Sequence, residues 1–131
     1  MLVFDHVSKR YPNGYDALSD VSLSVDAGEF VFLTGPSGAG KSTLLKLING
    51  VERSSRGQVH IAGQNITRLP ARKIPTLRQS IGVVFQNHQL LFDRRVYDNV
   101  ALPLLIAGMK PTDIGRRVRA ALSKVGLTGR E

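Results

Sequence analysis

The sequence predicts an α/β fold in which a glycine-rich loop joins a buried strand to a helix. Residues 30–33 (Phe-Val-Phe-Leu) are continuously apolar, as expected of a strand covered on both faces of a sheet. Glycines follow, and from Lys41 apolar residues recur at helical spacing until Gly50 provides a stop. Looser alternation over residues 2–8 and 21–25 indicates antiparallel strands that are half exposed.

Further elements are predicted along the rest of the chain. Residues 58–62 and 81–85 have the composition of strands, while the basic segment 69–79 contains two prolines and receives no assignment. Near the C-terminus, apolar residues at three- and four-residue intervals predict an amphipathic helix. Thr112 is expected to be its N-cap, and Gly126 is expected to end it.

The composition limits the class of protein. The chain has 131 residues, 42% of them hydrophobic, which suits a single globular unit or part of one. It has no cysteine, so disulfides and thiolate metal sites are excluded. The longest apolar run, residues 100–109, contains Pro103 and Gly108 and is too short to span a bilayer. The first residues lack the pattern of a secretory signal, so a cytoplasmic location is expected.

The formal net charge of +8 suits nucleic acid, an anionic membrane face or a phosphate-bearing ligand. The basic residues are scattered, with no RNA-binding aromatic signature and no zinc-finger spacing among them. Nucleic acid is therefore not the expected partner. A basic nucleic-acid-binding module stays open as an alternative of another class, and binding to DNA with a steep salt dependence would favour it.

Residues 35–42 (Gly-Pro-Ser-Gly-Ala-Gly-Lys-Ser) have the spacing of a phosphate-binding loop. Glycines let main-chain N–H groups approach a triphosphate closely, and the helix that follows adds its N-terminal amides and dipole. Lys41 can reach the β- and γ-phosphates, and the Ser42 hydroxyl can ligate Mg²⁺. The residues expected to bind ATP are Gly35, Pro36, Ser37, Gly38, Ala39, Gly40, Lys41, Ser42 and, in a supporting role, Thr43.

Other interpretations of this loop fit less well. A plain glycine-rich turn with a solvated lysine would not need the full motif between a strand and a helix. A GTPase would carry Asp-x-x-Gly and Asn-Lys-x-Asp, and neither motif occurs in the sequence. A small-molecule kinase would place an acidic metal ligand after a hydrophobic strand. The nearest candidate, Asp93, follows only three apolar residues, which are preceded by the polar run 87–89.

Three further features resemble the ATP-binding subunits of ABC systems. Tyr11 precedes the loop, residues 81–86 (Ile-Gly-Val-Val-Phe-Gln) follow it at the position of a Q-loop, and residues 96–104 resemble the segment that leads into the helical subdomain. The resemblance implies the N-terminal portion of a P-loop NTPase of ABC type. An antiparallel β subdomain and a strand–P-loop–helix core would occupy about 1–95, and the helical subdomain would start over about 96–131.

The resemblance also implies roles for single residues. Tyr11 would stack on adenine, and Gln86 would join Ser42 at Mg²⁺; packing of the tyrosine on the sheet and a plain loop glutamine are the alternatives. Residues 87–99 would receive a coupling helix, with Leu90, Leu91 and Phe92 exposed.

Partners and location follow from the same resemblance. Residues 32–46 and 88–100 are most similar to the ABC subunits of bacterial cell division. The implied partners are an integral membrane subunit, FtsX-like in that branch, and a second copy of the chain. The implied cofactors are ATP and Mg²⁺, and the implied location is the cytoplasmic face of the inner membrane. The ATPase of an exporter or of a lipoprotein-release system is the alternative within the family.

Three elements of a complete ABC ATPase are missing from the 131 residues: the Leu-Ser-Gly-Gly-Gln-like signature, the Walker B strand with its Asp-Glu, and a switch histidine. We therefore expect the N-terminal part of a longer ATPase, with no complete catalytic set of its own. Such a chain would bind nucleotide weakly and hydrolyse it poorly, because the acid that orients the attacking water is not present.

Overall fold

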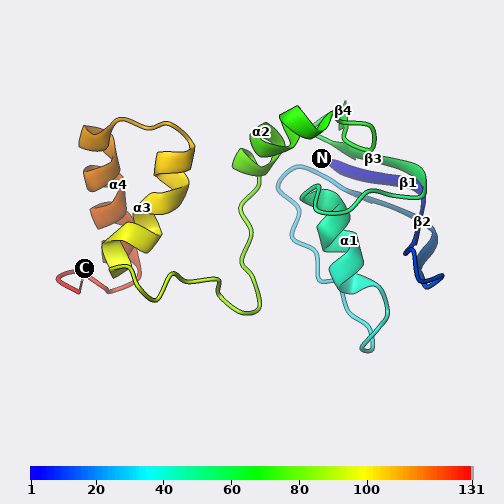
Figure 1. The fold of residues 1–131 in the computed structure, drawn as a ribbon, viewed down its shortest axis with the longest axis horizontal. Helices are drawn as coiled ribbons and strands as arrows, with labels where there is room; N and C mark the ends of the chain where they lie inside the picture. Colours follow the sequence, from blue (N-terminus) through cyan, green and yellow to red (C-terminus); the bar gives the residue numbers. More distant parts are fainter. Residues whose placement is uncertain (131) are drawn as a thin grey trace. The chain divides into compact units, whose positions relative to one another are not determined.

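The computed structural model describes residues 1–130, which divide into two compact units (Figure 1). The first unit comprises Met1–Ile81, and the second begins at Gly82. The resemblance predicts that the helical subdomain starts at about residue 96, and the first helix of the second unit begins at Val96. The contacts group residues 82–95 with these helices.

A four-stranded sheet forms the frame of the first unit. Its strand order is β2-β1-β3-β4, and all neighbouring strands are antiparallel. The strands predicted near residues 2–8, 21–25 and 58–62 are confirmed, and the first two are longer than expected. The bounds are β1 Leu2–Arg10, β2 Asp16–Val25, β3 Arg56–Ile61 and β4 Gln64–Asn65.

An irregularity interrupts the ladders in the middle of β1. The register shifts between Phe4 and Val7 on the β2 side, and His6 and Asp20 both have positive φ, of 49° and 51°. On the other side Gly57 lies so close that a Cβ atom would be 2.2 Å from the carbonyl oxygen of His6. Only glycine fits at position 57, so the bulge in β1 requires a glycine at the facing position of β3.

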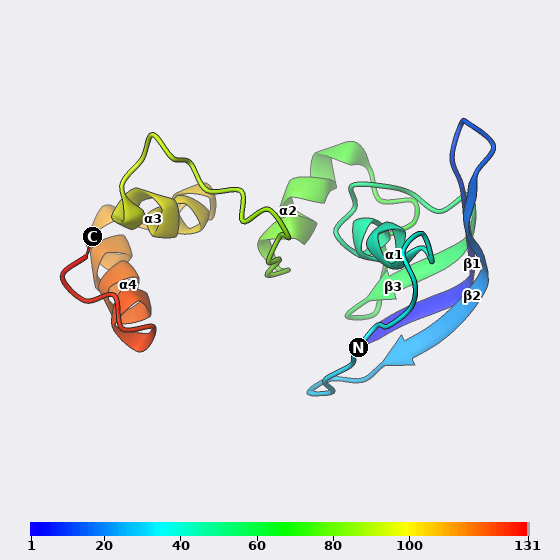
Figure 2. The same ribbon diagram turned by 90° about the horizontal axis from the view of Figure 1, so that it is seen from below.

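Helix α1 (Lys41–Ile48) packs on this sheet, as Figures 1 and 2 show. The predicted helix is confirmed, and Gly50, with φ of 65°, follows its C-cap residue Asn49. Leucines from α1, apolar side chains from the strands and three residues from the segment after β4 share one core: Phe4, Val7, Leu18, Leu44, Leu47, Val59, Ile66, Leu69 and Leu77. This core holds the start of α1 in a fixed place relative to β1 and β2.

The basic segment without a predicted structure is helical. It contains a short 3₁₀ helix, η1 (Ala71–Lys73), and α2 (Ile74–Gln79). Its two prolines stand where a helix tolerates them, Pro70 as the N-cap of η1 and Pro75 in the first turn of α2. Leu77 of α2 is buried in the core, which explains why so short a helix is stable.

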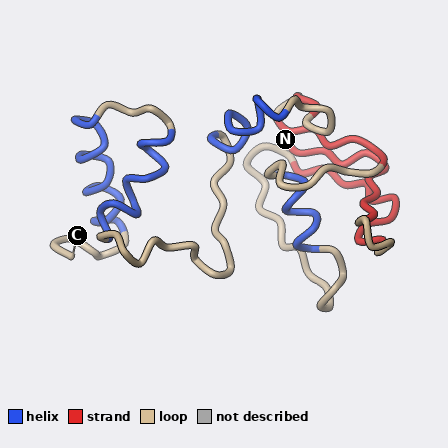
Figure 3. Tube along the Cα trace, viewed as in Figure 1, coloured by secondary structure: helices blue, strands red, loops and turns tan. Residues whose placement is uncertain are grey.

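Two predicted strands are wrong. Residues 30–33 and 81–85 are drawn as loop in Figure 3, and neither pairs with the sheet formed by the described residues. Phe30, Phe32 and Val84 are 82%, 81% and 96% exposed. An apolar run becomes a central strand only when neighbouring strands accept its hydrogen bonds and helices cover both faces. The antiparallel sheet offers these segments neither, and the rings of Phe30 and Phe32 instead meet edge to face at 5.0 Å.

The second unit is a helical hairpin of α3 (Val96–Ile106) and α4 (Pro111–Lys124). Ile114, Val118 and Leu122 on one face of α4 are buried with Ala101 of α3. The amphipathic helix is therefore confirmed, but the prediction of Thr112 as its N-cap is wrong. Lys110 takes that position, because Pro111 has the φ of a first helical residue and needs no partner for an N–H.

Helix α3 was predicted only as the start of the helical subdomain, from the resemblance, and not from its own residue pattern. It is apolar nearly all round and contains Pro103, so no periodic stripe marks it. Its helical state depends on packing against α4, to which Tyr97, Val100 and Leu104 contribute. Within residues 1–130 no helix has the length and hydropathy needed to cross a membrane.

Candidate nucleotide-binding site

The predicted phosphate-binding loop runs directly into α1. Gly38 and Gly40 have φ of 80° and 90°, a region that favours glycine, and Gly40 is the N-cap residue of the helix. A Cβ atom on Gly40 would lie 2.4 Å from the carbonyl oxygen of Ala17 in β2. No side chain among the described residues caps the first amides of α1. These amides are the donors that such a loop offers to a phosphate.

Lys41 lies over the same loop. Its Nζ donates to the carbonyl oxygens of Gly35 and Pro36, both at 2.6 Å. These contacts keep the ammonium on the loop, and a phosphate oxygen is an anionic acceptor that would bind it more strongly. One ammonium and several main-chain N–H groups are thus gathered within a few residues.

Ser42 and Thr43 have different environments at the start of α1. Ser42 is exposed, so its hydroxyl is accessible for a metal ion. Thr43 is buried, with 8% of its surface exposed, and its hydroxyl lies 3.2 Å from the hydroxyl of Tyr11. These environments fit a metal ligand at Ser42 and a supporting role for Thr43. The donor set as a whole suits a magnesium–triphosphate complex.

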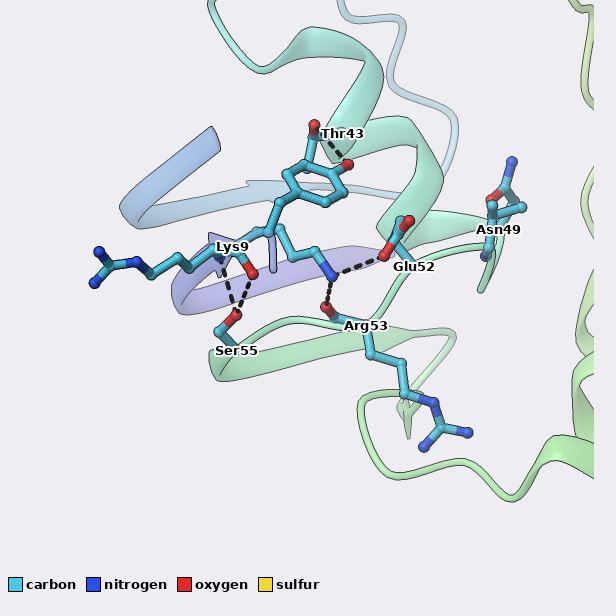
Figure 4. A network of polar contacts seen from close by, with 9 residues as sticks. Lys9, Thr43, Asn49, Glu52, Arg53 and Ser55 are labelled. Carbon is cyan, nitrogen blue, oxygen red and sulfur yellow. Dashed lines mark hydrogen bonds and ion pairs between the residues drawn. The ribbon is translucent and has the colours of Figure 1, made fainter. Parts of the chain in front are cut away.

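Two contacts hold the Tyr11 side chain, one at its hydroxyl and one at its ring. Its hydroxyl contacts Thr43, and the Nζ atom of Lys9 lies 4.9 Å from the centre of its ring. Figure 4 shows the polar partners of Lys9, which are a carboxylate oxygen of Glu52 at 2.7 Å and the carbonyl oxygen of Arg53 at 2.9 Å. The aromatic residue expected to stack on adenine is therefore joined to the loop that would hold the phosphates.

Tyr15 also reaches the loop and was not identified from the sequence. Its hydroxyl donates to the carbonyl oxygen of Gly38 at 2.7 Å. The turn that carries it is closed by the N–H of Tyr11, which donates to the carbonyl of Tyr15, and by the N–H of Gly14, which donates to the carbonyl of Tyr11. The only sequence signal was a second tyrosine within the same short turn. Lys9 was missed as well, because a single lysine in a strand has no distinctive pattern.

Gln86 belongs to the second unit, where it is exposed, so its pairing with Ser42 stays a prediction.

The segment 87–99, which follows Gln86, is ordered by hydrogen bonds of its own. The Asn99 side chain accepts from the N–H of Leu91 at 2.8 Å and donates to the carbonyl oxygens of Leu91 and Arg95, both at 3.0 Å. Leu90, Leu91 and Phe92 are 52%, 43% and 93% exposed.

Comparison with known proteins decides which family carries this loop. The family model described as ABC transporter matches residues 18–131. The chain belongs to the ABC transporter family. The predicted resemblance is thereby confirmed, and so is the fold class, the N-terminal portion of an ABC ATP-binding domain with an antiparallel sheet and helices.

Individual relatives agree with this assignment. The chain is 59% identical over 127 residues to the cell division ATP-binding protein FtsE of Escherichia coli strain K12, covering 97% of this chain and 57% of that protein. It is 44% identical over 131 residues to the FtsE of Mycobacterium tuberculosis, covering 99% of this chain and 57% of the relative. The chain thus spans little more than half the length of the curated relatives it matches.

A solved structure has the same fold. The structure of the ATP-binding cassette MJ0796 as a post-hydrolysis dimer bound to ADP and Pi superposes with a TM-score of 0.89 at 32% identity. The match covers 99% of this chain and 59% of that one. A nucleotide-bound dimer is therefore established for the similar cassette.

Proposed function

We propose that this chain is the nucleotide-binding part of an ABC ATP-binding subunit of bacterial cell division. It binds MgATP with the loop Gly35–Thr43, and nucleotide binding is coupled to an integral membrane subunit, FtsX-like, at the cytoplasmic face of the inner membrane. The observation that carries the proposal is the placement of Lys41 over a glycine loop that opens an uncapped helix. The identity of 59% to a cell division ATP-binding protein supports the biological setting.

This proposal gives different roles to the loop, to Gln86 and to Tyr11. The main-chain N–H groups of residues 38–43 and the Lys41 ammonium neutralise the phosphates, while the Ser42 hydroxyl and the Gln86 amide oxygen would hold Mg²⁺. Mg²⁺, when bound, would offset the negative charge of the phosphates. Tyr11 provides a flat aromatic face for the base. No complete catalytic set is assigned to these 131 residues.

Titration calorimetry with ATP and Mg²⁺ tests the site. The charge-assisted bond that Lys41→Ala removes is worth about 1.5–3 kcal/mol, so we expect the affinity to fall at least about tenfold. Lys46→Ala is the matched control, since Lys46 is an exposed lysine in the last turn of the same helix. Unchanged ATP affinity in Lys41→Ala would contradict the proposal. So would binding of DNA with a steep salt dependence that Lys41→Ala leaves unaltered.

Slow hydrolysis is a second expectation. The groups assigned here hold phosphates but include no acid to orient water, so phosphate release should be slow in this chain. Rapid release that Lys41→Ala abolishes would overturn this part of the proposal.

Residues 87–99 are proposed as the surface that receives the membrane subunit. Three consecutive exposed apolar residues, Leu90, Leu91 and Phe92, suit a contact with an apolar helix face. The order that Asn99 imposes on the loop lowers the entropy cost of that contact. Phe92→Glu should reduce co-purification with a co-expressed FtsX-like subunit, while Val125→Glu, which changes an exposed residue at the end of α4, should not.

A further inference from the structure

Lys9 is a charged residue inside the first unit. It belongs to β1, and only 9% of its surface is exposed. An ammonium loses most of its hydration at such a position, so it is stable there only with close polar partners. Glu52 and the carbonyl oxygen of Arg53 are these partners, at 2.7 and 2.9 Å (Figure 4).

The partners of Lys9 lie at the C-terminal end of the helix that carries the phosphate-binding loop. The N–H groups of Val51 and Glu52 both donate to the carbonyl oxygen of Lys46, at 2.9 and 3.1 Å. These bonds hold Val51 and Glu52 against the last turn of α1. Lys9 therefore anchors the end of β1 to the far end of that helix.

A third contact of Lys9 is directed at the nucleotide site. Its Nζ atom lies 4.9 Å from the centre of the Tyr11 ring, within the range of a cation–π interaction. The Tyr11 hydroxyl is 3.2 Å from the hydroxyl of Thr43 in the first turn of α1. The ring is thus fixed by Lys9 on its face and by Thr43 at its tip.

These contacts fix the Tyr11 ring, on which a base can stack, relative to the loop that can bind phosphates. A ring that is already fixed loses little conformational entropy when a base packs on it, whereas a mobile ring loses more. The Lys9 charge is balanced by Glu52 at 2.7 Å, so its net effect on the phosphates is small. Loss of Lys9 should therefore act on the base rather than on the phosphates.

We propose that Lys9 is a positioning residue that holds Tyr11 for the base, and so sets the preference of the site for a nucleoside triphosphate over an inorganic polyphosphate. This inference rests on the proposed function of the loop Gly35–Thr43. It assigns to a residue of β1 a role in base selectivity that is separate from the role of Lys41.

Calorimetry with two ligands tests the inference on the whole chain. ATP and inorganic tripolyphosphate are titrated, each with Mg²⁺, into the unmodified protein and into Lys9→Met. Immobilising a side chain on binding costs about 0.5–1.5 kcal/mol, so ATP affinity should fall about two- to thirteenfold when the ring is no longer held. Tripolyphosphate affinity should stay within about twofold, because the phosphate donors are unchanged. Lys9→Arg keeps a cation over the ring and should restore most of the preference for ATP.

A second variant guards against misfolding. Lys9→Met alone leaves the Glu52 carboxylate without its cation, so the double variant Lys9→Met, Glu52→Met removes both charges together. Far-UV circular dichroism checks that it is folded, and it should show the same loss of ATP preference. An equal loss of affinity for both ligands, or an unchanged ratio of ATP affinity to tripolyphosphate affinity, would overturn the role of Lys9. Neither result would contradict the proposed function of the loop. Failure of the unmodified chain to bind either ligand would overturn the proposed function and this inference with it.

Discussion

The guanidinium of Arg78 donates from Nε to the main-chain carbonyl oxygen of Asn49 at 3.0 Å. Its Nη2 also donates to the carbonyl oxygen of Gly50 at 3.2 Å. A positive charge from α2 is thereby placed at the C-terminal end of α1, where the helix dipole is negative and carbonyl groups lack helical partners. The helix that carries the phosphate-binding loop is thus capped by a side chain that is distant in the sequence.

Arg78→Ala should destabilise the first unit. It removes two hydrogen bonds to main-chain carbonyls and a favourable charge at the helix end, together worth about 1–2 kcal/mol of unfolding free energy. Arg72→Ala is the control, because Arg72 is exposed in η1. Urea denaturation followed by circular dichroism measures both variants. Equal stability of the two would show that the Arg78 bonds contribute nothing.

Gly40→Ala should be more damaging than an alanine at another glycine with similar backbone angles. Gly40 and Gly63 have φ of 90° and 79°, so both variants pay about 1–2 kcal/mol for a left-handed alanine. Only at Gly40 would the new Cβ meet the carbonyl oxygen of Ala17, at 2.4 Å, whereas nothing lies within 4 Å at Gly63. We expect an additional loss of about 1–3 kcal/mol at Gly40 in thermal unfolding. Matching losses would mean that the loop relaxes away from β2.

Tyr15→Phe should loosen the phosphate-binding loop without unfolding the protein. It deletes the hydroxyl that donates to Gly38 at 2.7 Å, while the ring is already 49% exposed. An exposed hydrogen bond contributes about 0.5–1 kcal/mol, so hydrogen exchange at the loop amides should accelerate about two- to fivefold. Tyr97→Phe, in the second unit, serves as the control. Unchanged exchange at the amides of residues 37–40 would refute the restraint.

The pKa of His6 should lie above the ordinary histidine value. The hydrogen bond from its ring to Asp20, at 2.7 Å, is the main cause of its raised pKa, and the charges of Asp20 and Asp5 act in the same direction. The imidazole proton signals of the three histidines, followed by NMR from about pH 5 to 9, measure the shift. Asp20→Asn should return the pKa of His6 towards the ordinary value.

The same shift gives a pH dependence of stability with a definite sign. Because the pKa of His6 is higher in the folded state than in the unfolded state, its stabilising contribution is complete below the unfolded value of about 6.5. The contribution is lost as the pH rises through the folded pKa. Both side chains are exposed, at 74% and 73%, so the effect is small. A melting temperature difference between the parent and Asp20→Asn that grows with pH would contradict this assignment.

The local elements of the nucleotide site could be predicted because their signals are local. The glycines of residues 35–40, the lysine after them and the apolar spacing from Leu44 onward specify a loop and a helix without reference to the rest of the chain. The hairpin of β1 and β2 was predictable from alternation and a turn signal for the same reason. These local signals did not indicate which of the predicted elements contact one another.

The strands predicted at residues 30–33 and 81–85 illustrate the opposite case. Their composition indicates burial, but burial of a strand requires partner strands and covering helices, which a local pattern does not provide. The residue pattern of α3 indicates no helix, and only the resemblance placed a helical subdomain there, because an apolar segment with an internal proline acquires its helical state from α4. In both cases the neighbours, rather than the residues themselves, determine the state of the segment.

From the sequence alone, residue types at fixed spacing predict a phosphate-binding loop, and the resemblance of further motifs predicts the ABC family that the comparison confirms. Only the tertiary structure decided which residues support that loop. Tyr11, held by Lys9, reaches Thr43, and Tyr15 reaches Gly38, while Arg78 reaches the end of the helix from α2. The contacts with Thr43, Gly38 and Asn49 each join residues that are distant in the sequence, and such meetings are fixed by the packing of α1 on the sheet.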